Sequence, residues 1–176
     1  MLTTNDPALA QRLAALRVHG SIRKYHHQWI GINSRLDALQ AAVLHVKLRY
    51  LDSWTEGRQR NAQQYRAHLE SASLPIVLPQ PAAWQTRHIY NQFVIRCEDR
   101  DSLRTWLTQE GIGTEIYYPL SLHLQPCFAG LGYKEGAFPV SERLARESLA
   151  LPIHPEMSSA DIDYVCGAIA QFYAKR

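Results

Sequence analysis

The segment Gly31–Asn33 is the first place in the sequence where residue types and their spacing could bind a ligand. It precedes a long amphipathic stretch in which Ser34 and Asp37 form an S-x-x-D helix start signal. Backbone N–H groups at a helix start attract anions, and the amide of Asn33 would add N–H donors for a phosphate. The same residues also fit a simple turn in which Ser34 caps the helix. From residue types alone, the turn is the favoured interpretation.

A second group of polar side chains stands at the end of Ile112–Pro119, a stretch that we expect to form a strand. Tyr117 and Tyr118 close this stretch, and His123 follows in the loop beyond it. Phenol and imidazole groups can contact a polar substrate, but a hydrogen-bonded loop histidine is an equally good interpretation of His123.

A third group, Lys24, Tyr25, His26 and His27, lies in the loop before Asn33. Adjacent histidines can ligate a metal ion, but no third ligand stands at a helical or hairpin spacing from them. We therefore predict no metal site and expect these side chains to be exposed at the edge of a subunit.

The composition is that of an ordinary globular protein, with 176 residues, 46% of them hydrophobic and 20% charged. The formal net charge of +3 comes from scattered Lys and Arg without a basic stripe, so we predict no nucleic-acid partner. Apolar runs are far shorter than a membrane span, and the N-terminal residues lack the apolar centre of a signal peptide. The three cysteines form no CxxC pair, which favours a reducing compartment. We expect a cytoplasmic protein with no membrane partner.

The positions of helix caps and prolines divide the chain into an N-terminal helical part and a C-terminal mixed part. Asp6 and Pro7 start a helix that should end at Gly20. A longer helix should begin at Ser34, kink or restart near Gly57, and continue to about residue 69. We assign residues 1–74 to the end of a large domain with its connecting helices, 75–88 to a proline-rich connection, and 89–176 to a small domain.

The small domain shows the alternation of strands and helices that is typical of an α+β fold. Its helices should lie on one face of the sheet. The expected order is a strand, a helix, a strand, a helix leading into an extended piece, and a closing helix: Ile89–Cys97, Asp99–Gly111, Ile112–Pro119, Phe138–Pro152 and Ser158–Arg176.

Six fragments in series resemble the C-terminal half of the DegT/DnrJ/StrS-type sugar aminotransferases. These enzymes use pyridoxal phosphate (PLP) and have the aspartate-aminotransferase fold, fold type I, an α/β parent fold. The resemblance covers nearly the whole chain, in the family's order and spacing. The fragments are TTNDPALAQRLAALRVHG, GINSRLDALQAAVLHVKLRYLD, GRQRNAQQYRAHL, HIYNQFVIR, EGIGTEIYYPLSLHLQP and FPVSERLARESLALPIHPEMSSADIDYV.

The resemblance implies an enzyme that transfers an amino group from glutamate to a keto group of a nucleotide-linked sugar. It also implies that the lysine that holds PLP lies upstream of the segment matching TTND. We therefore expect this chain alone to have no catalytic residue, to be inactive and to carry no PLP. Two alternatives stay open: a non-catalytic truncated module that only dimerises, and a parent that is a PLP-dependent sugar dehydratase, in which histidine replaces the lysine. The sugar, its aminated carbon and the nucleotide are not indicated.

The four lysines of the chain give no better candidate. A Schiff-base lysine must be desolvated, and none of them lies in a segment that matches the family's lysine motif: Lys24, Lys47, Lys134 and Lys175.

The resemblance assigns roles to particular side chains. Asn33 matches an asparagine that reaches the PLP phosphate of the partner subunit, and Arg35 follows it. Tyr25 and His26 lie where the partner subunit's contribution to the substrate pocket begins. His123 and Tyr118 border the nucleotide-sugar site, although Tyr117 stands where a histidine is usual. The family's enzymes are dimers, so we expect a homodimer or larger homo-oligomer in which residues 1–70 supply most of the contact.

Overall fold

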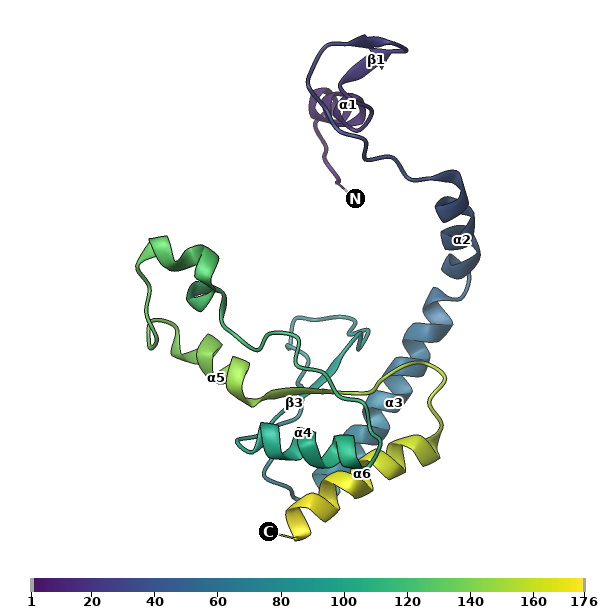
Figure 1. Cartoon of the computed structure of the whole chain (residues 1–176). Helices are drawn as coiled ribbons and strands as arrows, with labels where there is room; N and C mark the ends of the chain where they lie inside the picture. The colour runs from purple at the N-terminus through teal and green to yellow at the C-terminus, as the bar shows by residue number, and fades with distance from the viewer. Residues whose placement is uncertain (1, 176) are drawn as a thin grey trace. The chain divides into compact units, whose positions relative to one another are not determined.

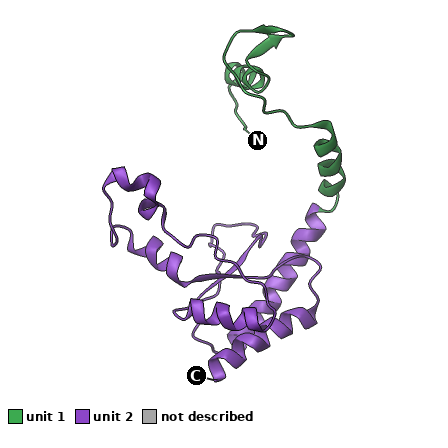
Figure 2. Ribbon diagram, in the orientation of Figure 1, with its two compact units in different colours: residues 1–50 green, residues 51–176 purple. Residues whose placement is uncertain are grey.

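The computed structural model describes residues 2–175. The chain forms two compact units, residues 1–50 and residues 51–176, and each is described by itself (Figure 2). The structure is a mixed helical one with two small sheets, each of two antiparallel strands (Figure 1).

The first unit begins with α1 (Pro7–Leu16), which starts where the sequence predicts. The Asp6 carboxylate accepts hydrogen bonds from the backbone N–H groups of Ala8 and Leu9 at 2.8 and 3.2 Å. These bonds satisfy two of the donors that a helix start leaves without a partner. The short hairpin of β1 (Ser21–Arg23) and β2 (His26–His27) follows.

Gly20 and Gly31 allow the backbone around this hairpin to pack closely. Gly20 has a φ of +74°, and a Cβ atom there would lie 1.8 Å from the carbonyl oxygen of Trp29. A Cβ atom on Gly31 would lie 2.4 Å from the backbone nitrogen of Gly20. Since a larger residue fits at neither position, both glycines are required by the local geometry.

The helix α2 (Ala38–Leu48) completes the first unit, and it begins later than the sequence predicts. Asp37 is its N-cap, accepting a hydrogen bond from the backbone N–H of Leu39 at 2.9 Å, so the prediction that Ser34 caps this helix was wrong. Its large apolar side chains are exposed, with Leu39 exposing 76% of its surface and Leu48 65%.

The helix α3 (Leu51–Ser71) opens the second unit. The break between the two long helices therefore falls at residues 49–50, and the predicted kink near Gly57 was wrong. Gly57 lies inside α3 and packs against Pro155, whose Cβ would lie 2.9 Å from a Cβ added at Gly57.

The sheet of the second unit consists of β3 (Phe93–Arg96) and β4 (Ser148–Leu151). Single β-bridges extend it on both sides: Val77 pairs with Arg96, and Glu115 pairs with Ala150. The predicted strand Ile112–Pro119 was wrong, because only Glu115 from this stretch joins the sheet.

The remaining helices of the second unit are α4 (Arg100–Gln109), α5 (Pro139–Glu147) and α6 (Ser159–Ala174), with two short 3-10 helices, η1 (Leu122–Leu124) and η2 (Pro126–Leu131), before α5. The start of α6 is the predicted capping box: the Ser158 hydroxyl accepts from the Asp161 N–H, and the Asp161 carboxylate accepts from the Ser158 N–H.

The core lies on one face of this sheet. Phe93, Ile95, Leu149 and Leu151 alternate onto that face and are at most 3% exposed. They join buried apolar residues of α3, α4 and α6, as the sequence predicts for helices on one sheet face. The Tyr65 ring of α3 stacks on Phe93 with 5.1 Å between centroids. No helix within residues 2–175 has the length and apolarity that crossing a bilayer would need.

Candidate functional site

The opposite face of the sheet carries an open pocket of about 800 Å³. Alternate residues of the two strands form its floor, since Val94, Ser148 and Ala150 point away from the core. Its walls come from the segment after Glu115 and from α5, so the expectation that every helix covers the core face was wrong for α5. The wall residues are mainly apolar and aromatic: Ile116, Tyr117, Tyr118, Leu120, Ser121, Leu122, Ala137, Phe138, Pro139, Val140, Ser141, Leu144 and Ala145.

Tyr118 lines this pocket and is 77% exposed, so its hydroxyl is accessible to a ligand. Tyr117 lines the same pocket and also a smaller polar one of about 300 Å³ beside Thr114 and Glu115. The hydroxyl oxygen of Thr114 is buried without a hydrogen-bond partner among the described residues. Tyr117 thus stands where the apolar pocket meets the polar one, and Tyr118 lines the apolar pocket alone.

His123 lies beside the pocket but makes an internal contact. Its Nε2 is 2.9 Å from Oε1 of Glu142, and the two side chains are 8% and 5% exposed. The structure therefore shows His123 as an internally hydrogen-bonded histidine of η1, and it does not line the pocket. The Glu142 carboxylate also accepts hydrogen bonds from the N–H groups of Gly136 and Phe138. These backbone hydrogen bonds, more than the contact with His123, hold the pKa of Glu142 below its ordinary value.

Sequence analysis missed Glu142. The only sequence signal for it is a proline at a helix start followed by an acidic residue in the first turn, and this pattern indicates a helix start rather than a contact. The partners of Glu142 are a 3-10 helix and a loop, whose conformations no periodicity indicates.

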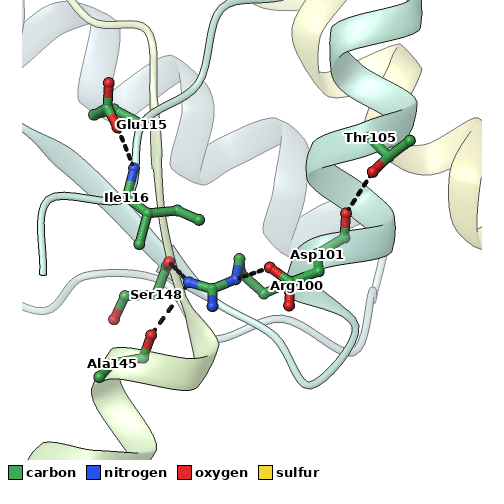
Figure 3. Close-up of polar contacts among 7 residues, drawn as sticks. All are labelled: Arg100, Asp101, Thr105, Glu115, Ile116, Ala145 and Ser148. Atoms are coloured by element: carbon green, nitrogen blue, oxygen red, sulfur yellow. Dashed lines mark hydrogen bonds and ion pairs between the residues drawn. The ribbon is translucent and has the colours of Figure 1, made fainter. Parts of the chain in front are cut away.

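Arg100 was also missed, and its guanidinium lies against the end of α5 and the start of β4 (Figure 3). It is 7% exposed, and its Nη1 donates to the carbonyl oxygens of Ala145 and Ser148 at 3.2 and 3.1 Å. Its Nε donates to the Asp101 carboxylate at 2.6 Å. Since Ala145 and Ser148 both line the pocket, Arg100 sets the position of the junction between α5 and β4.

The first unit holds the other candidate residues. Tyr25 and His26 lie on the β1–β2 hairpin and are exposed, Tyr25 by 82%. Asn33 pairs with Val18 in an antiparallel bridge, and its Oδ1 accepts a hydrogen bond from Nε of Arg35 at 3.0 Å. The structure thus brings Asn33 and Arg35 together on an exposed segment.

The helix-start argument for Asn33 was wrong. The helix begins at Ala38, and the Asp37 carboxylate already accepts one of its first N–H groups. Any phosphate site at Asn33 would therefore rest on the amide N–H₂ and the Arg35 guanidinium, without the helix dipole.

His26 and His27 do not gather a metal-ligand set. In the part of the chain that the structure describes, no group of three or more His, Cys, Asp or Glu residues could hold a metal ion. His27 instead places its Nδ1 3.0 Å from the carbonyl oxygen of His19.

Comparison with known proteins identifies the class. The chain belongs to the DegT/DnrJ/EryC1/StrS aminotransferase family, whose model matches residues 1–170. Members of this family use pyridoxal phosphate or its amino form, pyridoxamine phosphate.

Three relatives show the extent of the likeness. A pleiotropic regulatory protein of Geobacillus stearothermophilus is 47% identical over 98% of this chain and 46% of its own length. A dTDP-3-amino-3,4,6-trideoxy-alpha-D-glucose transaminase of Streptomyces venezuelae is 40% identical over 97% of this chain and 45% of its own length. The crystal structure of DesV from S. venezuelae is 41% identical and superposes with a TM-score of 0.90, covering 99% of this chain and 46% of that one. The chain thus spans about half the length of the curated relatives it matches.

The residues of this chain fit one part of a PLP site and not another. Asn33 and Arg35 offer exposed N–H donors and a positive charge, which suit a phosphate dianion. All four lysines are exposed, and a lysine that forms a Schiff base needs desolvation. The chain fits a phosphate contact but offers no lysine suited to the covalent bond.

Proposed function

We propose that this chain is the C-terminal portion of a PLP-dependent enzyme that transfers an amino group from glutamate to a keto group of a nucleotide-linked sugar. The observation that carries the proposal is the match to sugar transaminases over 97% of the chain, at 40% identity. Two such relatives are transaminases of dTDP-linked amino sugars, which is why we propose this substrate class.

In this proposal the residues of the chain bind and orient, and do not carry protons. Asn33 and Arg35 of one subunit would hold the phosphate of PLP bound in the partner subunit. Tyr118 of one subunit, with Tyr25 and His26 of the partner subunit, would contact the substrate, and His123 would support the neighbouring wall. Bound PLP supplies an electron-withdrawing ring that accepts the electron pair released at the amino-bearing carbon.

The first test separates this chain from the whole enzyme. The purified 176-residue protein, mixed with PLP and reduced with borohydride, should show no stoichiometric adduct on any one lysine, because all four are exposed. It should also show no glutamate-dependent amination. Turnover by this chain, or one lysine fully labelled, would contradict the proposal.

The second test concerns the phosphate contact, in a protein expressed together with the reading frame upstream of residue 1. Asn33→Ala should weaken PLP retention by roughly 1.5–3 kcal/mol, or about one to two decades in affinity. Asn5→Ala, at an exposed asparagine of the same unit, is the matched control. Equal retention in both variants would show that Asn33 only shapes the backbone.

We propose further that the chain associates with a second copy through residues 1–70. The support is α2, whose apolar residues Leu39, Val43, Leu44 and Val46 are each at least 54% exposed. A contiguous apolar surface of this kind is a liability for a monomer and typical of an interface. This surface also favours the alternative of a module that only dimerises.

Light scattering should show a dimer or larger species at micromolar concentration, and Val43→Glu should shift it towards the monomer. A monomeric wild-type protein would overturn this.

A further inference from the structure

Residues 121–138 form a long excursion between the sheet and α5, and both of its ends line the pocket. Ser121 and Leu122 line it at the start of the excursion, and Ala137 and Phe138 line it at the end. The regular structure within it consists of the short 3-10 helices η1 and η2. Such a segment has few backbone hydrogen bonds of its own and needs side-chain contacts to stay in place.

One carboxylate contacts both ends of this excursion. Oε1 of Glu142 lies 2.9 Å from Nε2 of His123, near the start. At the end, the N–H of Gly136 donates to Oε2 at 2.8 Å, and the N–H of Phe138 donates to Oε1 at 3.1 Å. A further link joins the Ser141 hydroxyl to the Ser121 hydroxyl at 3.2 Å.

The ring of Phe138 connects these bonds to the pocket. It packs edge-on against His123, with 4.8 Å between centroids, and against Tyr133, with 5.1 Å. Because Phe138 also lines the pocket, a loss of its N–H bond to Glu142 would move a wall residue.

We propose that Glu142 is a positioning residue that holds residues 121–138 as the wall of the sheet-face pocket, and that protonating its carboxylate in acid releases this wall. This inference does not depend on which ligand the pocket binds.

The charge state of the carboxylate decides whether the wall holds. An ionised carboxylate accepts only, so Nε2 of His123 must carry a proton in this contact. His123 from η1 is the titratable side chain that meets Glu142, and the loop before α5 presents the N–H groups of Gly136 and Phe138. Protonation would remove the charge and turn one acceptor oxygen into a donor.

The pH range follows from the direction of the shift. Backbone hydrogen bonds lower the pKa of Glu142 in the folded state. A lowered native pKa means that the stabilising contribution is present above the ordinary carboxyl pKa and is lost as the pH falls through the lowered value. The wall should therefore hold at neutral pH and in mild acid, and be released only below the ordinary glutamate range.

The experiment measures amide hydrogen exchange and chemical shifts by NMR on the whole chain. In Glu142→Gln at pH 7, the amides of Gly136 and Phe138 should exchange at least about tenfold faster, while Ile95 of β3 should change by less than about twofold. Glu135→Gln, an exposed glutamate in the same excursion, is the matched control and should change neither. In the wild type, the Gly136 amide shift should titrate in acid below the ordinary glutamate range, and this titration should be absent in Glu142→Gln.

Two results would overturn the proposal. Equal acceleration at Gly136 and Ile95 would mean that Glu142 supports the whole fold and not the wall, and unchanged exchange would mean that it holds nothing. If Glu142→Gln does not fold, the wild-type titration decides, together with His123→Gln, which should accelerate exchange at Leu124 before Ile95. A Gly136 amide shift that stays constant from pH 7 down to the onset of acid unfolding in the wild type would also refute the proposal.

Discussion

Replacing Arg100 by methionine tests whether a buried guanidinium fixes the junction between α5 and β4 (Figure 3). Methionine keeps an unbranched apolar stem of similar reach and removes the donors. Antiparallel pairing explains why β4 needs a donor here. Ala150 directs its N–H and C=O to Glu115, and alternate residues direct theirs to the same edge. The Ser148 carbonyl therefore points to that edge, where Arg100 donates to it.

The expected cost follows from the two carbonyl groups that would lose their donor. A buried acceptor left without a partner costs about 1–3 kcal/mol. The Ala145 carbonyl is part of a buried contact, whereas Ser148 is only half-buried and closer to water. The Ala145 carbonyl should therefore cost an amount near the top of this range and the Ser148 carbonyl an amount near the bottom. Together, Arg100→Met should lower the free energy of unfolding by about 2–4 kcal/mol.

Urea unfolding at pH 7, followed by tryptophan fluorescence, measures this cost. Trp106 is a suitable probe because its indole N–H donates to the Ala168 carbonyl at 2.9 Å in the same unit. With a urea slope of about 2 kcal/mol per M, the middle of the typical range, the midpoint should fall by roughly 1–2 M. Arg104→Met, at an exposed position on α4, is the control and should change stability by less than about 0.5 kcal/mol.

A lysine at position 100 tests whether the planar guanidinium matters. Arg100→Lys should recover only part of the loss, because an ammonium is a point charge that cannot span two carbonyl groups as a planar guanidinium does. If Arg100→Met is as stable as Arg104→Met, then water satisfies both carbonyl groups and Arg100 does not fix the junction.

Three other predictions concern buried thiols, close packing and a helix cap. Burial raises the pKa of Cys166 to about 12 and also raises that of Cys97. A thiol reagent at pH 8 should therefore label only the exposed Cys127 in the native protein, and all three cysteines in urea. Fast labelling of Cys166 in the native protein would contradict this. Gly57→Ala should lower the free energy of unfolding, measured in urea, by about 1–3 kcal/mol. Gly167→Ala should leave it unchanged or raise it, because the space around Gly167 is open. Equal effects of the two substitutions would refute the contact with Pro155. Hydrogen bonds from Ser158 lower the pKa of Asp161. The capping box should therefore stabilise the folded state above the ordinary aspartate pKa and lose this effect as the pH falls. In Ser158→Ala, NMR titration should show the pKa of Asp161 rising, and an unchanged pKa would refute the hydrogen bond.

Local signals in the sequence were sufficient at two helix starts and failed at a third, where Asp37 and not Ser34 is the cap. Asp6 with Pro7, and Ser158 with Asp161, start helices as predicted, because a cap is made by a side chain and the next three backbone N–H groups. The order of helices and strands in the second unit followed from the same kind of signal, apart from the stretch after residue 111.

Signals failed where the outcome depends on a distant partner. The residues of Ile112–Pro119 alternate as a strand does, but only Glu115 finds a strand edge to pair with. Gly57 was expected to break a helix, yet contact with Pro155 gives it a packing role inside one.

The candidate site was predictable only in its exposed parts. Tyr118 could be identified from its type and position, and it does line the pocket. The residues that hold the pocket together could not be identified. Glu142 meets His123 across 19 positions, and Arg100 meets Ala145 across 45. Lining the pocket does not test a substrate contact. The proposed roles of Asn33, Arg35, Tyr25, His26, Tyr118 and His123 therefore stay predictions.

The two single bridges beside β3 and β4 also bear on how the protein behaves at high concentration. An edge strand with a free row of N–H and C=O groups invites strands from other molecules, and this is a common route to fibrils. Here Val77 occupies part of the outer edge of β3, while Glu115 and the Arg100 side chain occupy that of β4. Each free row is thus too short for a continuous intermolecular ladder, and this sheet should resist growing into one when the protein is concentrated.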